Sequence, residues 1–154
     1  MAAPPLFLKE CESMSASGSL RSPPMQTVET RPFWEAASRG ELLFGRCGSC
    51  EEKHYYPRAR CPYCFSDQVE WQAASGRGHV YSYSVVRRSD PPYVTAYVTL
   101  VEGVTVFTNI VDCDIDRLSI GQPVMIGFEF CSDGQRVAVF RPANLDAESQ
   151  SSAG

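Results

Sequence analysis

The sequence predicts a mostly β protein: a short N-terminal helix, then a small cysteine-bearing ribbon, then a five-stranded barrel. Four of the seven cysteines form two C-x-x-C pairs between positions 47 and 64. After position 76 the pattern changes to strand-like segments rich in β-branched and aromatic residues. An apolar content of 44% over 154 residues is enough for a globular core.

A short helix is expected from Thr30, which can cap it, with Pro32 in the first turn. Phe33 and Trp34 give this segment apolar bulk, and Gly40 is a plausible C-terminal stop. Because an isolated helix this short is unstable, we expect these aromatic side chains to pack against the rest of the fold.

The two cysteine pairs are separated by ten residues, and each pair lets two thiolates converge from a tight turn. Two such turns facing each other give a tetrahedron of sulfurs, the geometry of a closed zinc site. We therefore predict one structural Zn2+ in a rubredoxin-like zinc ribbon, held by Cys47, Cys50, Cys61 and Cys64. Four protein ligands leave no position for water or substrate, so the predicted role is structural.

Other interpretations of the cysteines remain open at this point. A rubredoxin-type iron site uses the same four sulfurs, and ligand type alone separates zinc from iron poorly. A redox C-x-x-C needs only one pair, and two disulfides would need an oxidising compartment. His54 is an alternative ligand, which four cysteines make unnecessary.

The ribbon strands are expected at 41–46, at Tyr55 and Tyr56 on the returning side, and at 69–72. Such a ribbon has almost no core, so the metal must hold it together. The barrel strands are expected at 79–86, 93–101, 104–111, 123–130 and 136–140, with hairpin turns at 102–103 and 132–134. Five strands with this connectivity fit a Greek-key barrel of the OB type, and a small β-sandwich is the alternative.

The predicted organisation has four parts. Residues 1–29 form a disordered or loosely held arm, because their small, polar and proline-bearing composition cannot bury enough apolar surface. The helix and ribbon occupy 30–74, the OB-fold domain 75–142, and a disordered tail 143–154.

The net charge, the lengths of the apolar runs and the N-terminal residues limit the classes of protein to which this sequence can belong. The net charge is −4 and only Lys9 and Lys53 are lysines, which argues against a nucleic-acid binder with a basic footprint. No apolar run approaches the roughly 20 residues that span a bilayer. The first residues lack the basic start of a signal peptide. We therefore expect a cytoplasmic protein, in which thiolates stay reduced.

The order of these motifs resembles a known family. The motifs are Phe33-Trp34, the run 40–47 (GELLFGRC), the four-cysteine ribbon with Pro57 and Arg60, Trp71, the run 75–83 (SGRGHVYSY) and the run 118–124 (LSIGQPV). They are similar to those of the DUF35 family, zinc-ribbon OB-fold proteins associated with acyl-CoA enzymes. The resemblance covers about residues 30–142.

The resemblance implies a non-catalytic accessory subunit. Family members typically pair with thiolase-like proteins in complexes that form or cleave carbon–carbon bonds of CoA thioesters, as thiolases, retro-aldolases or acyltransferases. The partner supplies the catalytic groups, and the complex, rather than this chain alone, binds the CoA ester. The family member would help to form the CoA entrance. A two-plus-two hetero-oligomer is expected, since closed two-fold symmetry is the commonest arrangement.

The residues themselves agree with a role without an active site of its own. Cys113 and Cys131 lie on or beside predicted strands, where free cysteine is usually a small buried hydrophobe. His54 and His79 are in no recognisable dyad. Arginine and tyrosine favour interfaces, and arginine can hold CoA phosphates bidentately. The candidate interface or CoA-contacting residues are Tyr55, Tyr56, Arg58, Arg60, Arg77, Arg87 and Arg88.

Two other functions are weighed against this one. A single-strand nucleic-acid binder of OB type would use aromatic platforms. The candidates are Tyr81, Tyr83, Tyr93, Tyr97 and Phe107, which at strand spacing are more often expected in the core. A free-standing enzyme acting on a CoA ester is disfavoured because no activated nucleophile is recognisable.

Overall fold

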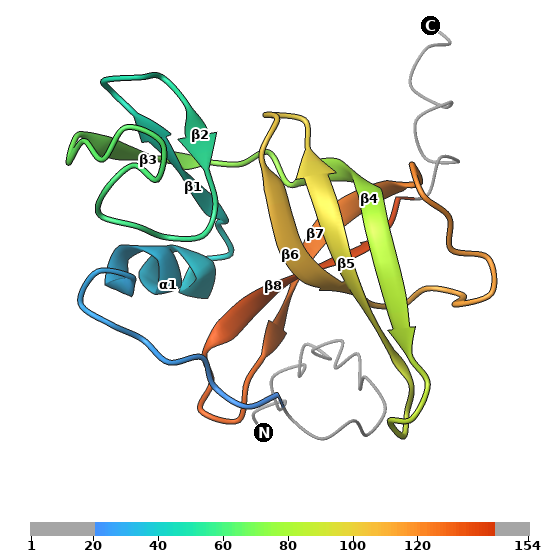
Figure 1. Cartoon of the computed structure of the whole chain (residues 1–154). Coiled ribbons are helices and arrows are strands. Elements are labelled where there is room, and N and C mark those ends of the chain that lie inside the picture. Colours follow the sequence, from blue (N-terminus) through green and yellow to red (C-terminus); the bar gives the residue numbers. More distant parts are fainter. Residues whose placement is uncertain (1–20, 144–154) are drawn as a thin grey trace, which may run out of the picture.

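The computed structural model describes residues 21–143 as a small ribbon lobe beside a closed barrel (Figure 1). The elements in chain order are α1 (Arg31–Ser38), β1 (Leu43–Cys47), β2 (Lys53–His54), β3 (Val69–Ala73), β4 (Arg77–Val86), β5 (Tyr93–Leu100), β6 (Thr105–Ile110), β7 (Pro123–Phe130) and β8 (Arg136–Pro142). No helix within residues 21–143 is long and apolar enough to cross a membrane.

Helix α1 lies beneath the ribbon and ends as expected, with Gly40 in the left-handed region (φ 81°) just past its C-terminus. Thr30 is the N-cap residue, as expected, but its hydroxyl makes no hydrogen bond to the first turn. That oxygen instead accepts a 3.0 Å hydrogen bond from the backbone N–H of Thr27. Phe33 and Trp34 are buried, so the helix is held by packing.

The ribbon is a three-stranded antiparallel sheet in the order β2-β1-β3. The returning strand was expected at Tyr55 and Tyr56, but β2 consists of the two residues before them. The register explains this shift, because His54 lies opposite Gly45 of β1, which has no side chain to displace it. Tyr55 and Tyr56 leave the sheet and pack on Phe33, at ring-centroid distances of 6.0 and 5.5 Å.

The barrel closes in the order β4-β5-β6-β8-β7, which confirms the OB prediction over a sandwich. The strand β7 has the predicted bounds, and β4 starts two residues earlier than predicted because Arg77 and Gly78 pair with β7. Closure between β6 and β8 is limited to one parallel bridge, Ile110 with Phe140.

Aliphatic side chains fill the barrel, and the aromatic ones lie mostly outside it. Val80, Val98 and Phe140 are fully buried. The expectation that the strand aromatics belong mainly to the core is wrong, since Tyr81, Tyr83, Tyr93, Tyr97 and Phe107 are exposed. A β-bulge between Val80 and Ser82 shifts the inward–outward alternation of side chains on β4. It leaves Tyr81 without a partner on β5 and 64% exposed.

The ribbon lobe and the barrel share one hydrophobic cluster, in which Phe33, Trp34 and Phe44 join the barrel interior. Polar bonds add two further attachments. Near the β5–β6 hairpin, Lys53 Nζ donates to the Glu102 carbonyl at 2.9 Å. Near α1, Gln135 Nε2 donates to the Trp34 carbonyl at 3.1 Å.

Arg21, the first described residue, lies beside the β7–β8 hairpin and forms a parallel β-bridge with Cys131. Its side chain donates to Glu129 Oε2 at 2.8 Å and to Asn109 Oδ1 at 2.6 Å. This end of the predicted arm is therefore attached to the barrel. The rest of the arm, residues 1–20, and the tail from 144 lie outside the described residues.

Candidate metal centre and interface groove

The two cysteine turns of the ribbon have the same local geometry. The backbone N–H of Cys47 donates to the Glu52 carbonyl, and that of Cys61 donates to the Ser66 carbonyl, both at 2.9 Å. The positive φ angles that close the turns belong to Glu51 (62°) and Phe65 (61°). Two matched turns therefore face each other, as the sequence spacing predicted.

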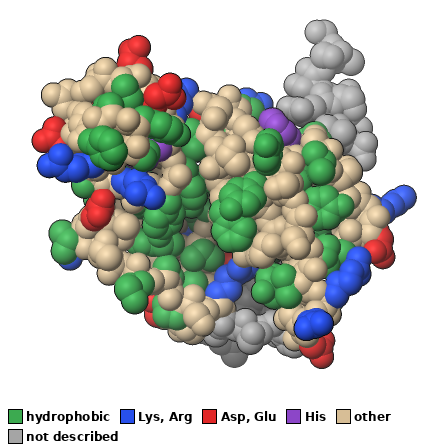
Figure 2. All heavy atoms as spheres, viewed as in Figure 1, with side chains coloured by type: hydrophobic (Ala, Val, Ile, Leu, Met, Phe, Trp, Pro, Cys, Tyr) green, Lys and Arg blue, Asp and Glu red, His purple; other side chains and the backbone are tan. Residues whose placement is uncertain are grey.

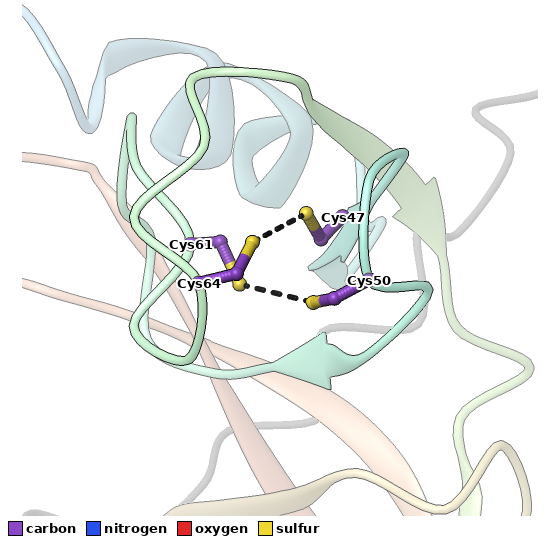
Figure 3. A group of neighbouring side chains, drawn as sticks. All are labelled: Cys47, Cys50, Cys61 and Cys64. Atoms are coloured by element: carbon purple, nitrogen blue, oxygen red, sulfur yellow. Dashed lines mark hydrogen bonds between the residues drawn. The ribbon is translucent and has the colours of Figure 1, made fainter.

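The four sulfurs converge on one point between these turns (Figure 3). All four lie within 4.8 Å of one another. Sulfurs from opposite turns lie 3.5 Å apart between Cys47 and Cys64 and 3.6 Å apart between Cys50 and Cys61. All four are free thiols, and these separations far exceed the roughly 2.05 Å of a disulfide. A tetrahedral Zn–S bond of 2.3 Å gives sulfur separations of about 3.8 Å.

Backbone N–H groups donate hydrogen bonds to two of the cluster sulfurs, which stabilises their thiolate form. The N–H of Ser49 donates to Cys47 Sγ, and that of Tyr63 donates to Cys61 Sγ, both at 3.4 Å. A hydrogen bond from the backbone of Cys50 lowers the pKa of Cys47 to about 6. Backbone hydrogen bonds also act to lower the pKa of Cys50 and of Cys64, but burial and the neighbouring sulfurs outweigh them, so the pKa of Cys50 is raised to about 12 and that of Cys64 is also raised. Because the thiolate is the metal-binding form, the donor set fits zinc. His54 is not part of the cluster.

A groove separates the ribbon from the barrel, and Figure 2 shows hydrophobic side chains gathered along it. Its volume is about 450 Å³, and its lining residues are Tyr55, Tyr56, Tyr97, Thr105 and Phe107. Tyr97 and Phe107 face each other across β5 and β6 with ring centroids 5.1 Å apart. The two ribbon tyrosines form the opposite wall, so the groove joins elements from both lobes.

The structure brings the two predicted interface tyrosines together but separates the arginines. Arg58 and Arg60 are exposed in the ribbon loop, where Arg60 donates to the Phe65 carbonyl at 3.3 Å. Arg77 starts β4, whereas Arg87 and Arg88 follow its last residue. A ten-residue strand is about 30 Å long, so these arginines do not form one patch. Their role stays a prediction.

The sequence interpretation missed Thr105 as a groove residue and treated Phe107 mainly as core. The alternation of side chains along β6 could have identified them. Val106, Thr108 and Ile110 face inward, so Phe107 faces outward and is 58% exposed.

Comparison with known proteins assigns both halves of the chain. A family model described as "ChsH2, rubredoxin-like zinc ribbon domain" matches residues 34–70. A second, "ChsH2, C-terminal OB-fold domain", matches residues 71–129. A "DUF35 domain-containing scaffold protein" of Methanothermobacter thermautotrophicus is 34% identical over 111 residues, covering 68% of this chain and 84% of the relative. The chain belongs to the DUF35 family.

Other relatives extend this assignment. A DUF35 scaffold protein of Methanocaldococcus jannaschii is 34% identical, covering 59% of this chain and 70% of the relative. A "probable enoyl-CoA hydratase alpha subunit" of Thermomonospora curvata is 37% identical over 76% of this DUF35 chain. The match spans only 39% of that longer protein.

Two solved structures resemble this DUF35 chain. One, described as an "Ltp2-ChsH2(DUF35) aldolase", matches with a TM-score of 0.71 and 33% identity, covering 79% of this chain and 100% of the other. A DUF35 protein of unknown function from Sulfolobus solfataricus matches with a TM-score of 0.59 over 77% of this chain and 87% of the other. Its identity is 13%, so it supports the fold alone.

Proposed function

We propose that this chain is a non-catalytic accessory subunit that assembles with a thiolase-like partner into an acyl-CoA carbon–carbon bond-forming or -cleaving complex. The observation that carries the proposal is the match over the full length of a chain from the Ltp2-ChsH2(DUF35) aldolase. Relatives named as scaffold proteins support a role in assembly. The partner would supply the catalytic groups.

In this proposal, one structural zinc held by Cys47, Cys50, Cys61 and Cys64 stabilises the ribbon, which stands beside the barrel as part of the binding surface. The complex binds the CoA thioester, and this chain contributes to the entrance. A two-plus-two assembly is the expected stoichiometry.

The test is reconstitution. The tagged chain is purified from cells of its source, a co-purifying thiolase-like protein is identified by mass spectrometry, and both are then produced recombinantly. We expect stoichiometric association, and turnover of a CoA ester that depends on the partner's catalytic residues. Turnover by the purified chain alone, or the absence of any thiolase-like partner, would contradict the proposal.

One observation favours a second candidate, single-strand nucleic-acid binding: the exposed aromatics of β5 and β6 resemble stacking platforms. Neither strand contains an acidic or basic residue, and the net charge of the chain is −4. The phosphate backbone therefore finds no counter-charge on these strands. Binding of a fluorescent single-stranded oligonucleotide that weakens steeply with salt would favour this candidate over the first.

A further inference from the structure

The strand β6 has an open edge beside the groove. On one side β6 pairs with β5 along its whole length. On the other side, within the described part of the chain, its bridge to β8 is limited to Ile110. The two strands are still close at Thr108, whose hydroxyl donates to the Ala138 carbonyl at 3.2 Å. The open part of the edge therefore runs from Thr105 to Phe107.

The hydrogen-bond alternation shows which backbone groups this edge presents. The N–H of Leu100 donates to the Val104 carbonyl at 2.8 Å, so Val104 is in a hydrogen-bonded pair with β5. Antiparallel pairs alternate, which places Val106 in the next hydrogen-bonded pair and leaves Thr105 and Phe107 in non-hydrogen-bonded pairs. The N–H and C=O groups of Thr105 and Phe107 therefore point away from β5.

An unpaired edge of this kind is a template for another extended chain. Here it adjoins an aromatic groove, because Thr105 and Phe107 also line the cavity of about 450 Å³ that Tyr55 and Tyr56 close from the ribbon side. The edge can pair with the backbone of an added strand, and the groove can receive one of its side chains.

The charge of this surface limits what can bind there. The outward residues of β5 and β6 are tyrosine, threonine, phenylalanine and asparagine, without an acidic or basic side chain. A charged segment would lose hydration against these two strands without gaining an ionic partner on them, since the nearby charges of Lys53 and Glu102 lie at the β5–β6 hairpin. An uncharged segment with apolar side chains matches the surface, and tyrosine is favoured at protein interfaces.

We propose that an extended, uncharged segment of the partner subunit adds to the β6 edge at Thr105 and Phe107 and places an apolar side chain in the aromatic groove. This inference rests on the proposed function, since the thiolase-like subunit is the occupant. The edge is closed at its other end, where Arg21 bonds to Asn109 and β8 approaches. The added strand therefore enters from the β5–β6 hairpin, away from the first described residue of this chain (Figure 1).

Amide hydrogen exchange tests the backbone part of the proposal. In the isolated full-length chain, the amides of Thr105 and Phe107 should exchange quickly and that of Val106 slowly, because only Val106 donates within the barrel. Adding the recombinant thiolase-like subunit that co-purifies with the chain should slow exchange at Thr105 and Phe107. A complex that forms without protecting them overturns this inference and leaves the proposed function standing.

A charge placed on the edge tests the side-chain part. Phe107→Lys should weaken partner binding by about tenfold or more, because the ammonium would be buried in an uncharged interface. Ile120→Lys is the matched control, an apolar-to-lysine change at a 71% exposed position outside the groove, and should bind normally. Thr105→Lys is the second edge variant if the first fails to fold, as judged by its circular dichroism and metal content.

The remaining outcomes also decide the question. Protection of Thr105 and Phe107 in the isolated chain that disappears on deleting residues 1–20 would mean that the chain's own arm occupies the edge, and would overturn the proposal. Normal binding by folded Phe107→Lys and Thr105→Lys would do the same. A chain that binds no thiolase-like subunit overturns this inference together with the proposed function.

Discussion

His54 lies directly opposite Gly45 in the ribbon sheet. A Cβ built on Gly45 would lie 2.5 Å from His54 Nε2, so the ring occupies the space that a side chain would need. His54 is 4% exposed, and neither ring nitrogen has a hydrogen-bond partner within residues 21–143. His54 thus acts as a packing group that the absence of a side chain at position 45 makes possible.

Gly45→Ala should destabilise the chain by roughly 1–3 kcal/mol, the usual cost of overpacking. Urea unfolding of the metal-loaded chain measures it. The matched experiment is the double variant Gly45→Ala/His54→Ser, in which the clash is removed and the added cost of the alanine should largely disappear. Equal costs in both backgrounds would show that the ring does not cause the effect.

Burial lowers the pKa of His54 below its ordinary value of 6.5, and the positive charge of Arg58 acts in the same direction. Above pH 7 the imidazole is neutral in both folded and unfolded chains. As the pH falls below about 6.5, the unfolded chain binds a proton that the folded chain excludes, so stability is lost until the folded pKa is reached.

His54→Leu should therefore lose less unfolding free energy than the wild type between pH 7.5 and pH 5.5. Because acid also weakens thiolate–metal binding, the exposed histidine variant His79→Leu serves as the control that keeps this second effect constant. An identical pH dependence in His54→Leu and His79→Leu would refute the assignment.

At the scale of the elements, the ribbon depends on its metal more than the barrel does. Two of its three strands flank the first cysteine turn, and β2 has only two residues. Cys64→Ser should abolish stoichiometric zinc, measured by elemental analysis, and unfold the ribbon, because these four ligands replace a core. Cys113→Ser, which changes a thiol outside the cluster, should retain both metal and fold.

Local chemistry explains which elements could be predicted. The paired C-x-x-C turns encode the ribbon, Gly40 ends α1, and alternating aliphatic residues mark the barrel strands. The position of β2 depends on where the His54 ring can pack, and the exposure of Tyr81 on β4 depends on the bulge in the pairing of β4 with β5. Neither property can be read from a single strand, because each arises from pairing with another.

The same limit applies to the candidate site. The convergence of the four sulfurs could be predicted because the cysteines are close in sequence. The groove could not, because Tyr55 and Phe107 lie in different lobes and meet only after the chain has folded. The arginines were grouped by residue type, and the length of β4 separates Arg77 from Arg87.

At the scale of the whole molecule, one continuous cluster and two polar attachments couple the lobes. Both tryptophans lie in the ribbon half, so fluorescence reports the ribbon and far-ultraviolet circular dichroism reports mainly the barrel. With metal bound, we expect both probes to give one coincident thermal transition.

The carboxylate of Glu102 bonds the linker between the lobes, accepting from the backbone N–H of Ser75 at 2.6 Å. Glu102→Ala should lower the transition temperature by a few degrees, as a loss of about 1 kcal/mol does in a chain of this size. Glu129→Ala, which removes a contact to the arm instead, should leave the fluorescence and dichroism transitions coincident. Separation of the two transitions in Glu102→Ala alone would show that this bond adds to the coupling of the lobes by the shared cluster, and an unchanged transition temperature would contradict its role.

The loop that bears Tyr55 and Tyr56 is fixed at both ends by cysteines of the sulfur cluster. The metal therefore adds to the packing on Phe33 that holds this wall of the groove, whereas the other wall belongs to the barrel. For the proposed complex we therefore predict an order of maturation, in which metal binding precedes assembly. We expect a chain prepared without metal to retain its barrel but to bind its partner far more weakly than the metal-loaded chain does.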